Sequence, residues 1–243
     1  MPGFFISFEG ATGVGKTTMA TRLCDTLKER GHDVLVVPEF SDSLIGRSIH
    51  ESLTRDPFLR LPPLSETLLV TADRAFFTER VIVPALKQGK VVIKDRYYDS
   101  TYVYQPYRFV EDGYHTNKEQ VFKWLDAFHE FFVIRPNITF LLQAGPEDAL
   151  KRQALNKGWR ITSEDVRMAE ETAKIYEDLV SRDPARFIRI DSYVTTIDAV
   201  AEKVLQKTLD VMGKDHHIHA PDLFKEDLSQ KTLADFGNGK PQV

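Results

Sequence analysis

The sequence predicts an α/β fold, with five parallel strands in one sheet and helices on both of its faces. Two observations predict it. Short apolar runs typical of buried strands alternate with stretches of helical periodicity, and the first run breaks into a glycine-rich loop directly before a helix. The expected strands cover residues 4–8, 33–37, 90–95, 138–142 and 186–191.

The glycine-rich loop matches G-x-x-x-x-G-K-[ST] at every fixed position, which indicates a P-loop NTPase-type fold. Such a loop aims backbone N–H groups and the positive end of a helix dipole at one point, where a triphosphate can bind. Lys16 is expected on the β- and γ-phosphates, and Thr17 on Mg²⁺. The predicted ATP-binding residues of the loop are Gly10, Ala11, Thr12, Gly13, Val14, Gly15, Lys16, Thr17 and Thr18.

Helical periodicity follows each expected strand. A first helix passes through Met19, Leu23 and Leu27. Pro84 should kink the long helix expected near residues 65–88 or start a new turn there. The later helices are expected at residues 44–53, 65–88, 117–132, 145–155, 163–181 and 197–212.

Length and composition favour one domain that binds a small anion. The 243 residues are 42% apolar, enough for a full core, and we expect one P-loop domain over residues 1–213 with a polar extension over 214–243. A net charge of −4 provides no excess of basic residues for binding a nucleic acid polymer. No apolar run approaches a membrane span, and the single Cys24 fits a reducing compartment, so we expect a cytoplasmic protein.

The loop after the second strand is a candidate wall for a second substrate, because ligands of open α/β sheets collect at the carboxyl ends of strands. This loop covers residues 38–43. Glu39 and Phe40 can face a ligand there, or they can serve as a helix approach and a core aromatic residue. The sequence favours neither reading.

The third strand ends on Asp95, which Arg96 follows. A carboxylate delivered beside a P-loop can position Mg²⁺ directly or through water, and Arg96 can then reach a phosphate. The alternative is a surface Asp–Arg pair.

Residues 100–109, further along the chain, are rich in aromatic residues. Such residues more often build a core than a platform for a base, and Gln105 stands out among them as a polar residue.

Four basic residues surround a short glycine break: Lys151, Arg152, Lys157 and Arg160. Cations on a hinged segment can close over phosphates, so we expect a lid near residues 152–162. The alternative is a solvated basic turn, and only the upstream P-loop favours the lid.

Three histidines lie close together near the C-terminus, at 216, 217 and 219. Their closeness suits a surface tail better than a closed metal site.

With these residues in view, the chain resembles the thymidylate kinase family of nucleoside monophosphate kinases over residues 4–212. The resemblance depends on four segments in order: FEGATGVGKTT, TADRA, VVIKDRYYDS with Tyr-Gln shortly after it, and RFIRID. It implies phosphoryl transfer from ATP, with Mg²⁺, to dTMP or a close analogue, and a homodimer formed through long helices.

The resemblance also implies roles for individual residues. Lys16 and Arg160 would contact the transferring group, and Thr17 and Asp95 would organise Mg²⁺. Arg152 would join the ATP site. The residues implied for the acceptor are Glu39, Phe40, Val70, Arg74, Arg96, Tyr97, Ser100 and Gln105, with Arg96 on the phosphate and Arg74 and Gln105 on the base.

Three positions depart from the family pattern, and all concern the acceptor. Thr12 stands where the family usually has an acid, Val70 where an aromatic ring commonly stacks on thymine, and Phe40-Ser41 where an arginine or a diglycine is usual. We hypothesise that Phe40 supplies the lost ring from the opposite wall. Two other functions stay open: a kinase for a nucleoside or modified nucleotide, and a P-loop switch without a small acceptor.

Overall fold

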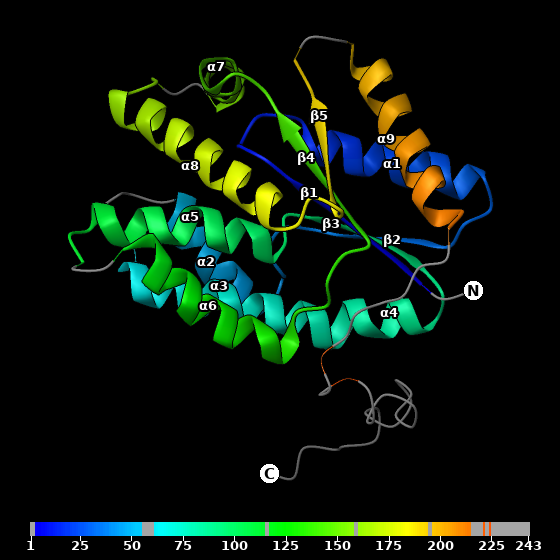
Figure 1. The fold of residues 1–243 in the computed structure, drawn as a ribbon, viewed down its shortest axis with the longest axis horizontal. Coiled ribbons are helices and arrows are strands. Elements are labelled where there is room, and N and C mark those ends of the chain that lie inside the picture. The colour runs from blue at the N-terminus through cyan, green and yellow to red at the C-terminus, as the bar shows by residue number, and fades with distance from the viewer. Residues whose placement is uncertain are drawn as a thin grey trace.

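The computed structural model describes residues 3–54, 61–114, 117–157, 160–193, 196–214, 221 and 224. Its five strands form one all-parallel sheet in the order β2-β3-β1-β4-β5, with helices on both faces (Figure 1), as the sequence predicts. The strands are β1 (Phe4–Glu9), β2 (Val34–Val37), β3 (Val91–Asp95), β4 (Ile138–Gln143) and β5 (Phe187–Asp191).

The helices lie close to the expected positions, with one addition. Residues 100–109, expected only as an aromatic-rich stretch, belong to a helix that has Pro106 inside it. The helices are α1 (Lys16–Glu29), α2 (Leu44–Thr54), α3 (Pro63–Phe77), α4 (Val83–Lys87), α5 (Tyr98–Glu111), α6 (Lys118–Phe132), α7 (Pro146–Lys157), α8 (Ser163–Arg182) and α9 (Ile197–Met212).

The long helix expected near residues 65–88 is continuous but changes its pitch. A π-helical turn, η2 (Thr78–Ile82), joins α3 to α4, and Pro84 lies in the first turn of α4. Proline has no N–H to donate, and its ring clashes with the carbonyl of the preceding turn. A wider turn accommodates both effects without ending the helix.

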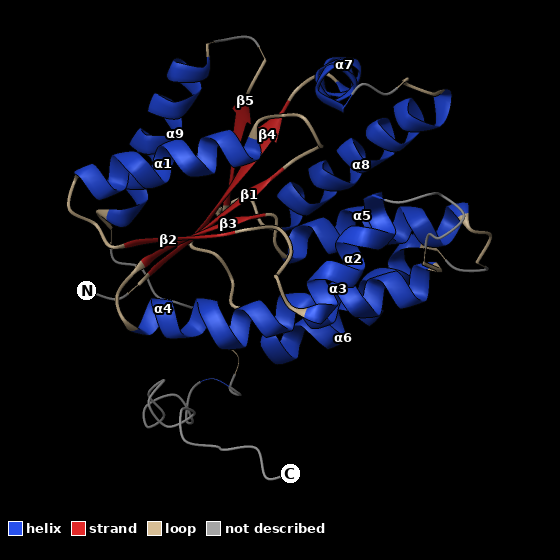
Figure 2. Ribbon diagram, turned by 180° about the vertical axis from the view of Figure 1, so that it is seen from behind, coloured by secondary structure: helices blue, strands red, loops and turns tan. Residues whose placement is uncertain are grey.

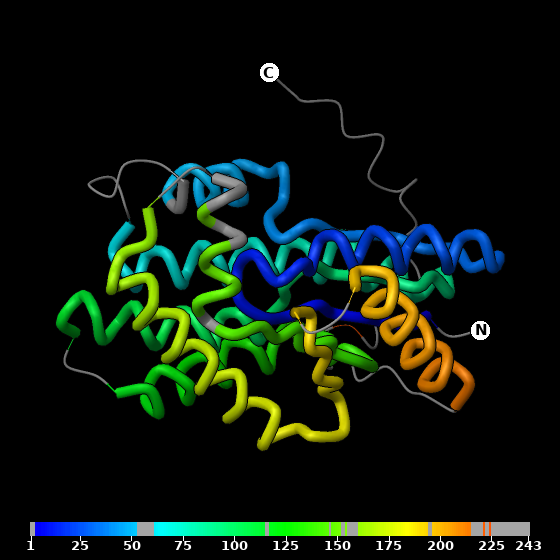
Figure 3. The backbone as a smooth tube through the Cα atoms, turned by 90° about the horizontal axis from the view of Figure 1, so that it is seen from above, coloured from blue at the N-terminus to red at the C-terminus, as the bar shows by residue number. Residues whose placement is uncertain are grey.

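The two faces of the sheet are covered by different sets of helices (Figure 2). On one face, α1 and α9 lie side by side (Figure 3), and their apolar side chains belong to one cluster with Phe4, Ile6 and Phe8 of β1. The other face is covered from α3 through α4 at one end and by α5, α6 and α8 at the other. Because β1 is covered on both faces, all six of its residues are buried, which explains its almost uninterrupted apolar run.

The strand order brings three loops to one edge of the sheet. The P-loop follows β1, residues 96–97 follow β3, and the loop over residues 38–43 follows β2. Since β1 and β3 pair in parallel, with Phe8 opposite Asp95, the P-loop and the end of β3 are neighbours. β2 pairs with β3 on its other side, so the loop at 38–43 joins them. This edge is where ligands of open α/β sheets bind.

Candidate active site

Positive φ angles shape the P-loop, with values of 129° at Gly10, 87° at Gly13 and 95° at Gly15. A Cβ on Gly10 would also lie 2.1 Å from the carbonyl oxygen of Leu142. Both facts require glycine at this position. The loop can therefore pass close to β4 and turn directly into α1.

Lys16 lies at the start of α1, and its Nζ donates a 2.8 Å hydrogen bond to the carbonyl oxygen of Ala11. Burial, and next the charge of Arg96, lower the pKa of the Lys16 ammonium to about 7. An anion bound within the loop would favour the charged form and raise this pKa again. The lysine is therefore placed where a phosphate would complete its environment.

Thr17 and Asp95 form a pair of oxygen donors beside the P-loop. The Thr17 hydroxyl donates a 2.5 Å hydrogen bond to Oδ2 of Asp95. The other carboxylate oxygen, Oδ1, is buried and has no hydrogen-bond partner within the described residues. A buried carboxylate oxygen without a partner is costly unless a cation or water completes it.

Arg96 follows β3 in the left-handed region, with a φ of 56°, which a residue with a Cβ rarely adopts. Its N–H donates to the Phe8 carbonyl oxygen at 3.0 Å, and the next N–H, that of Tyr97, donates to Oε1 of Glu9 at 2.7 Å. Glu9 is fully buried at the end of β1. These contacts hold a conformation that costs on the order of 1 kcal/mol.

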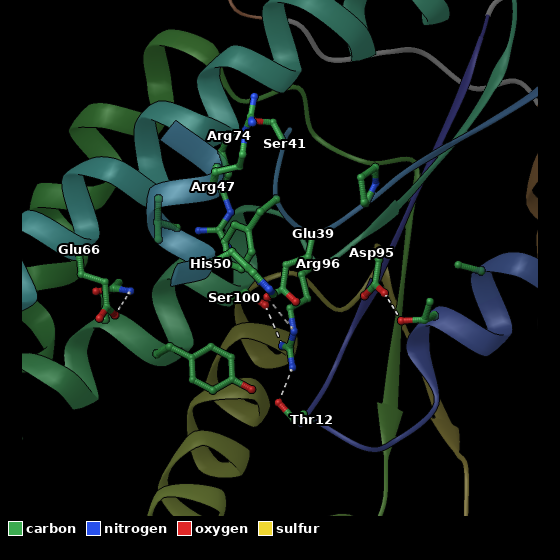
Figure 4. A pocket seen from close by; sticks show the side chains of 18 of the residues that line it. Thr12, Glu39, Ser41, Arg47, His50, Glu66, Arg74, Asp95, Arg96 and Ser100 are labelled. Carbon is green, nitrogen blue, oxygen red and sulfur yellow. Dashed lines mark hydrogen bonds and ion pairs between the residues drawn. The ribbon is translucent and has the colours of Figure 1, made fainter. Parts of the chain in front are cut away.

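The Arg96 guanidinium lies among hydroxyl groups and one carboxylate (Figure 4). It donates to the hydroxyls of Ser100 at 3.1 Å and Thr12 at 3.3 Å, and its Nε is 3.3 Å from Oε1 of Glu39. The ring of Tyr104 lies under it, with its centroid 5.1 Å from Cζ. Arg96 is thus a buried, oriented cation whose guanidinium can donate two parallel hydrogen bonds to a phosphate.

One cavity of about 820 Å³ is lined by half of the predicted site residues. In Figure 4, Asp95 lies at one side of this cavity, Arg96 and Ser100 near its middle and Glu66 at the far side. The structure therefore brings ten of the predicted residues together. They are Thr12, Thr17, Glu39, Phe40, Val70, Arg74, Asp95, Arg96, Ser100 and Gln105.

The end of the cavity far from the P-loop is polar. Arg74 is 5% exposed and donates to the Thr101 hydroxyl. The Gln105 amide accepts from Thr67 at 2.6 Å and donates to Oε1 of Glu66 at 3.2 Å. These contacts fix the side chains of Arg74 and Gln105 without a ligand, as a rigid recognition surface requires.

Tyr97 is not part of this cavity, which corrects its expected position. Its side chain is fully buried, its hydroxyl bonds to Thr78 at 2.7 Å, and its ring packs edge-on against Phe5 with centroids 5.2 Å apart. The left-handed Arg96 explains this, because it turns residue 97 toward the core while residue 96 faces the cavity.

The predicted lid is only partly described. Arg160 is exposed and does not line the cavity. The Arg152 side chain, residues 158–159 and the three histidines at 216, 217 and 219 lie outside the described part of the chain.

Sequence reasoning missed several residues that line or support the cavity. Glu66, Arg47, His50 and Arg108 carry charge or polarity into it from α2, α3 and α5, but no motif marks them. Lys94 was visible as a charged residue inside an apolar strand, an unusual placement that could have marked it.

Comparison with known proteins decides the family. The family model for thymidylate kinase matches residues 8–204. The chain belongs to the thymidylate kinase family. The thymidylate kinase of Caldanaerobacter subterraneus subsp. tengcongensis is 38% identical over 191 residues, which is 79% of this chain and 88% of the relative.

Two further relatives agree with this. The thymidylate kinase of a Thermoanaerobacter species is 33% identical over 214 residues, covering 88% of this chain and 99% of the relative. The probable thymidylate kinase of Methanoculleus marisnigri is 36% identical over 187 residues, covering 77% and 85%. Membership confirms the predicted enzyme class, a nucleoside monophosphate kinase that uses ATP to phosphorylate dTMP. In the described residues, no helix combines the length and apolarity needed to span a membrane.

Proposed function

We propose that this chain transfers the γ-phosphoryl group of ATP to dTMP, giving dTDP and ADP, in the cavity between the P-loop and α5. One observation carries the proposal: the Thr17–Asp95 pair and the cations Arg74 and Arg96 line the same cavity. Phosphoryl transfer needs two anions held in line and the charge between them neutralised. A P-loop switch would need no such second set of cations.

Mg²⁺ would be held by Thr17 and Asp95. A hydroxyl and a carboxylate with one oxygen lacking a partner are the hard donors that this ion prefers. Among the described residues no group of three or more His, Cys, Asp or Glu side chains could hold a metal, so phosphate oxygens and water would complete the coordination. When bound, the ion would neutralise charge on the β- and γ-phosphates.

The acceptor would lie along the rest of the cavity. Arg96 would take the 5′-phosphate, while Ser100 and Glu39 orient its guanidinium. Arg74 and Gln105 would face the base at the far end. Phe40 and Val70 both line the cavity, which supports Phe40 as the ring that compensates for Val70.

The lid is part of the same proposal. Arg160, and Arg152 with it, would approach the transferring phosphoryl group when residues 152–162 close over bound ATP. Arg160 is exposed, and therefore free of the packing that would prevent such a movement. Closure would exclude water and add positive charge where negative charge develops.

We also propose that the enzyme acts in the cytoplasm as a homodimer. The single Cys24 is a free thiol, as a reducing compartment allows. Large apolar side chains are exposed on α3 and α6, a pattern typical of protein interfaces: Leu64, Leu68, Phe76, Phe128 and Phe131. Sedimentation of the wild type and of Phe131→Glu tests this, and a wild-type monomer would contradict it.

A coupled ADP-release assay tests the reaction. ATP and Mg²⁺ are supplied with dTMP, dUMP, dCMP, dAMP, dGMP or thymidine, and Lys16→Ala is the control for turnover by this site. We expect the highest rate with dTMP and none with thymidine, which has no phosphate for Arg96. Equal or higher rates with purine monophosphates or thymidine would overturn the assignment of the acceptor.

A further inference from the structure

We propose that Lys94 is a positioning residue for the acceptor: its buried ammonium fastens the loop of residues 38–42, the acceptor loop, to the end of β3. All five residues of this loop line the cavity. The inference builds on the proposed function, because this loop forms one wall of the proposed dTMP site.

Lys94 is the next-to-last residue of β3 and has no exposed surface. Its Nζ donates to the carbonyl oxygens of Pro38, Glu39 at 3.0 Å and Asp95 at 3.3 Å. The Phe77 ring completes its surroundings, with the centroid 4.7 Å from Nζ. An ammonium has three N–H donors, and here each has a carbonyl oxygen to bond.

Burying a lysine inside a strand is costly unless its charge has partners. Two of the three partners of Lys94 belong to the acceptor loop. The hydrogen bonds of the ammonium therefore stabilise one conformation of that loop. The apolar neighbours Val92 and Ile93 show what β3 uses where only packing matters.

A second anchor holds the other end of the loop. Asp73 of α3 accepts from the Ser41 hydroxyl and, at 3.1 Å, from the Ser41 N–H. Gly46 of α2 packs against the same residue so closely that a Cβ would lie 2.0 Å from the Ser41 carbonyl oxygen. Both ends of the loop are thus fixed, and Phe40 lies between them.

The two anchors fix side chains in the acceptor half of the cavity. With its carbonyl held by Lys94, Glu39 keeps Oε1 3.3 Å from Nε of Arg96, and Phe40 keeps its place on the wall. Nζ bonds no side chain of the P-loop. Loosening the loop should therefore affect dTMP far more than ATP.

The test uses Lys94→Met, which keeps the length of the side chain but removes the ammonium, and Ile93→Val as the control. Ile93 is equally buried in β3 but packs on the opposite face with α1. We expect the KM for dTMP to rise about tenfold or more in Lys94→Met, as expected for lost hydrogen bonds to a charged group. The KM for ATP should change by less than about twofold, and Ile93→Val should match the wild type.

Amide hydrogen exchange gives a second measurement that requires no substrate. Peptides that cover residues 38–46 should exchange faster in Lys94→Met, while P-loop peptides should not change. If Lys94→Met does not fold, Ser41→Ala provides the test, because it removes the hydroxyl bond of the other anchor and leaves only the bond from the Ser41 N–H. It should show the same pattern to a smaller extent. An unchanged dTMP KM with unchanged exchange, or equal increases in both KM values, would overturn the inference. A wild type inactive with dTMP would instead reject the proposed function.

Discussion

The hydroxyl of Thr17 lies 2.5 Å from Oδ2 of Asp95, although 78 positions separate the two residues. Parallel pairing of β1 and β3 creates this contact, because it places Phe8 opposite Asp95 and so brings the P-loop beside the end of β3. Without a metal the hydroxyl donates to the carboxylate. In the proposed function, Thr17 and Asp95 would hold Mg²⁺.

Replacement of Asp95 tests this arrangement. Asp95→Asn should lower kcat about 10- to 100-fold and shift the Mg²⁺ dependence to higher concentrations, because the amide is neutral and binds the cation poorly. Steady-state rates over a magnesium titration measure both effects. Asp191→Asn, at the end of β5 and outside the cavity, should behave like the wild type. If the Asp95→Asn enzyme had an unchanged magnesium dependence, Asp95 would not be a residue of the metal site.

In the proposed acceptor site, Phe40 is the ring that stacks on the base. Phe40→Ala should raise the KM for dTMP about fivefold to tenfold, since a stacked ring contributes roughly 1 kcal/mol. The KM for ATP should stay constant. Tyr193→Ala removes an exposed ring that does not line the cavity and serves as the control. If Phe40→Ala had wild-type kinetics with dTMP, Phe40 would not replace the ring missing at Val70.

The sheet could be predicted closely from the sequence, because parallel strands covered on both faces are apolar along their whole length. The residues from 33 to 37 and from 90 to 95 became β2 and β3 with a change of one residue at the start of each. The helix α5 could not be assigned in the same way. Its aromatic residues suit strands as well, and Pro106 argues against a helix, so only packing against α3, α6 and α8 decides its form.

In the site, too, residues in a local motif could be predicted from the sequence, whereas residues that depend on long-range contacts could not. The P-loop is a local motif, so its residues could be named from spacing alone. The side-chain direction of Tyr97 depends on the positive φ of Arg96, which the sequence does not reveal. Lys94 and Asp73 act on a loop that is distant in sequence, and such contacts exist only once the strand order is known.

A buried ion pair connects α5 to the start of β5. Arg186 donates to both carboxylate oxygens of Asp99, at 2.6 and 2.8 Å, and the two side chains are 7% and 1% exposed. Arg186→Met should lower the free energy of unfolding by about 3–5 kcal/mol, because it leaves a buried charge without its partner. Urea denaturation measures this. Arg189→Met, which breaks an exposed pair between Arg189 of β5 and Glu177 of α8, should cost less than about 1 kcal/mol. Equal losses for the two variants would contradict a special role for the buried pair.

His129 should make the stability depend on pH. The side chain is buried among the rings of Tyr98, Tyr102 and Phe132, and within the described residues neither ring nitrogen has a hydrogen-bond partner. Burial, and next the charge of Arg74, lower the pKa of His129 to about 3.

In the unfolded chain this histidine takes up a proton near pH 6.5, whereas in the folded chain it stays neutral. The stability that the neutral form contributes is therefore fully present above about pH 6.5 and is lost as the pH falls toward 3, by about 1.4 kcal/mol per pH unit. Urea denaturation between pH 7.5 and 4.5 should show a shallower loss in His129→Leu than in the wild type. Parallel pH profiles would show that His129 becomes protonated in the folded protein.

Phe224 should stabilise the domain from outside the region that the family model matches, which ends at residue 204. Its side chain is 6% exposed and packs in the same apolar cluster as Phe5, Val37 and Phe132. Phe224→Ala should lower the free energy of unfolding by about 2 kcal/mol, the value expected for removing one buried aromatic side chain. A chain that ends at residue 213 should lose a similar amount in thermal and urea denaturation, whereas a chain that ends at residue 224 should keep the full stability. If the chain that ends at 224 were as unstable as the one that ends at 213, the stabilisation would come from residues after 224 and the role of Phe224 would be refuted.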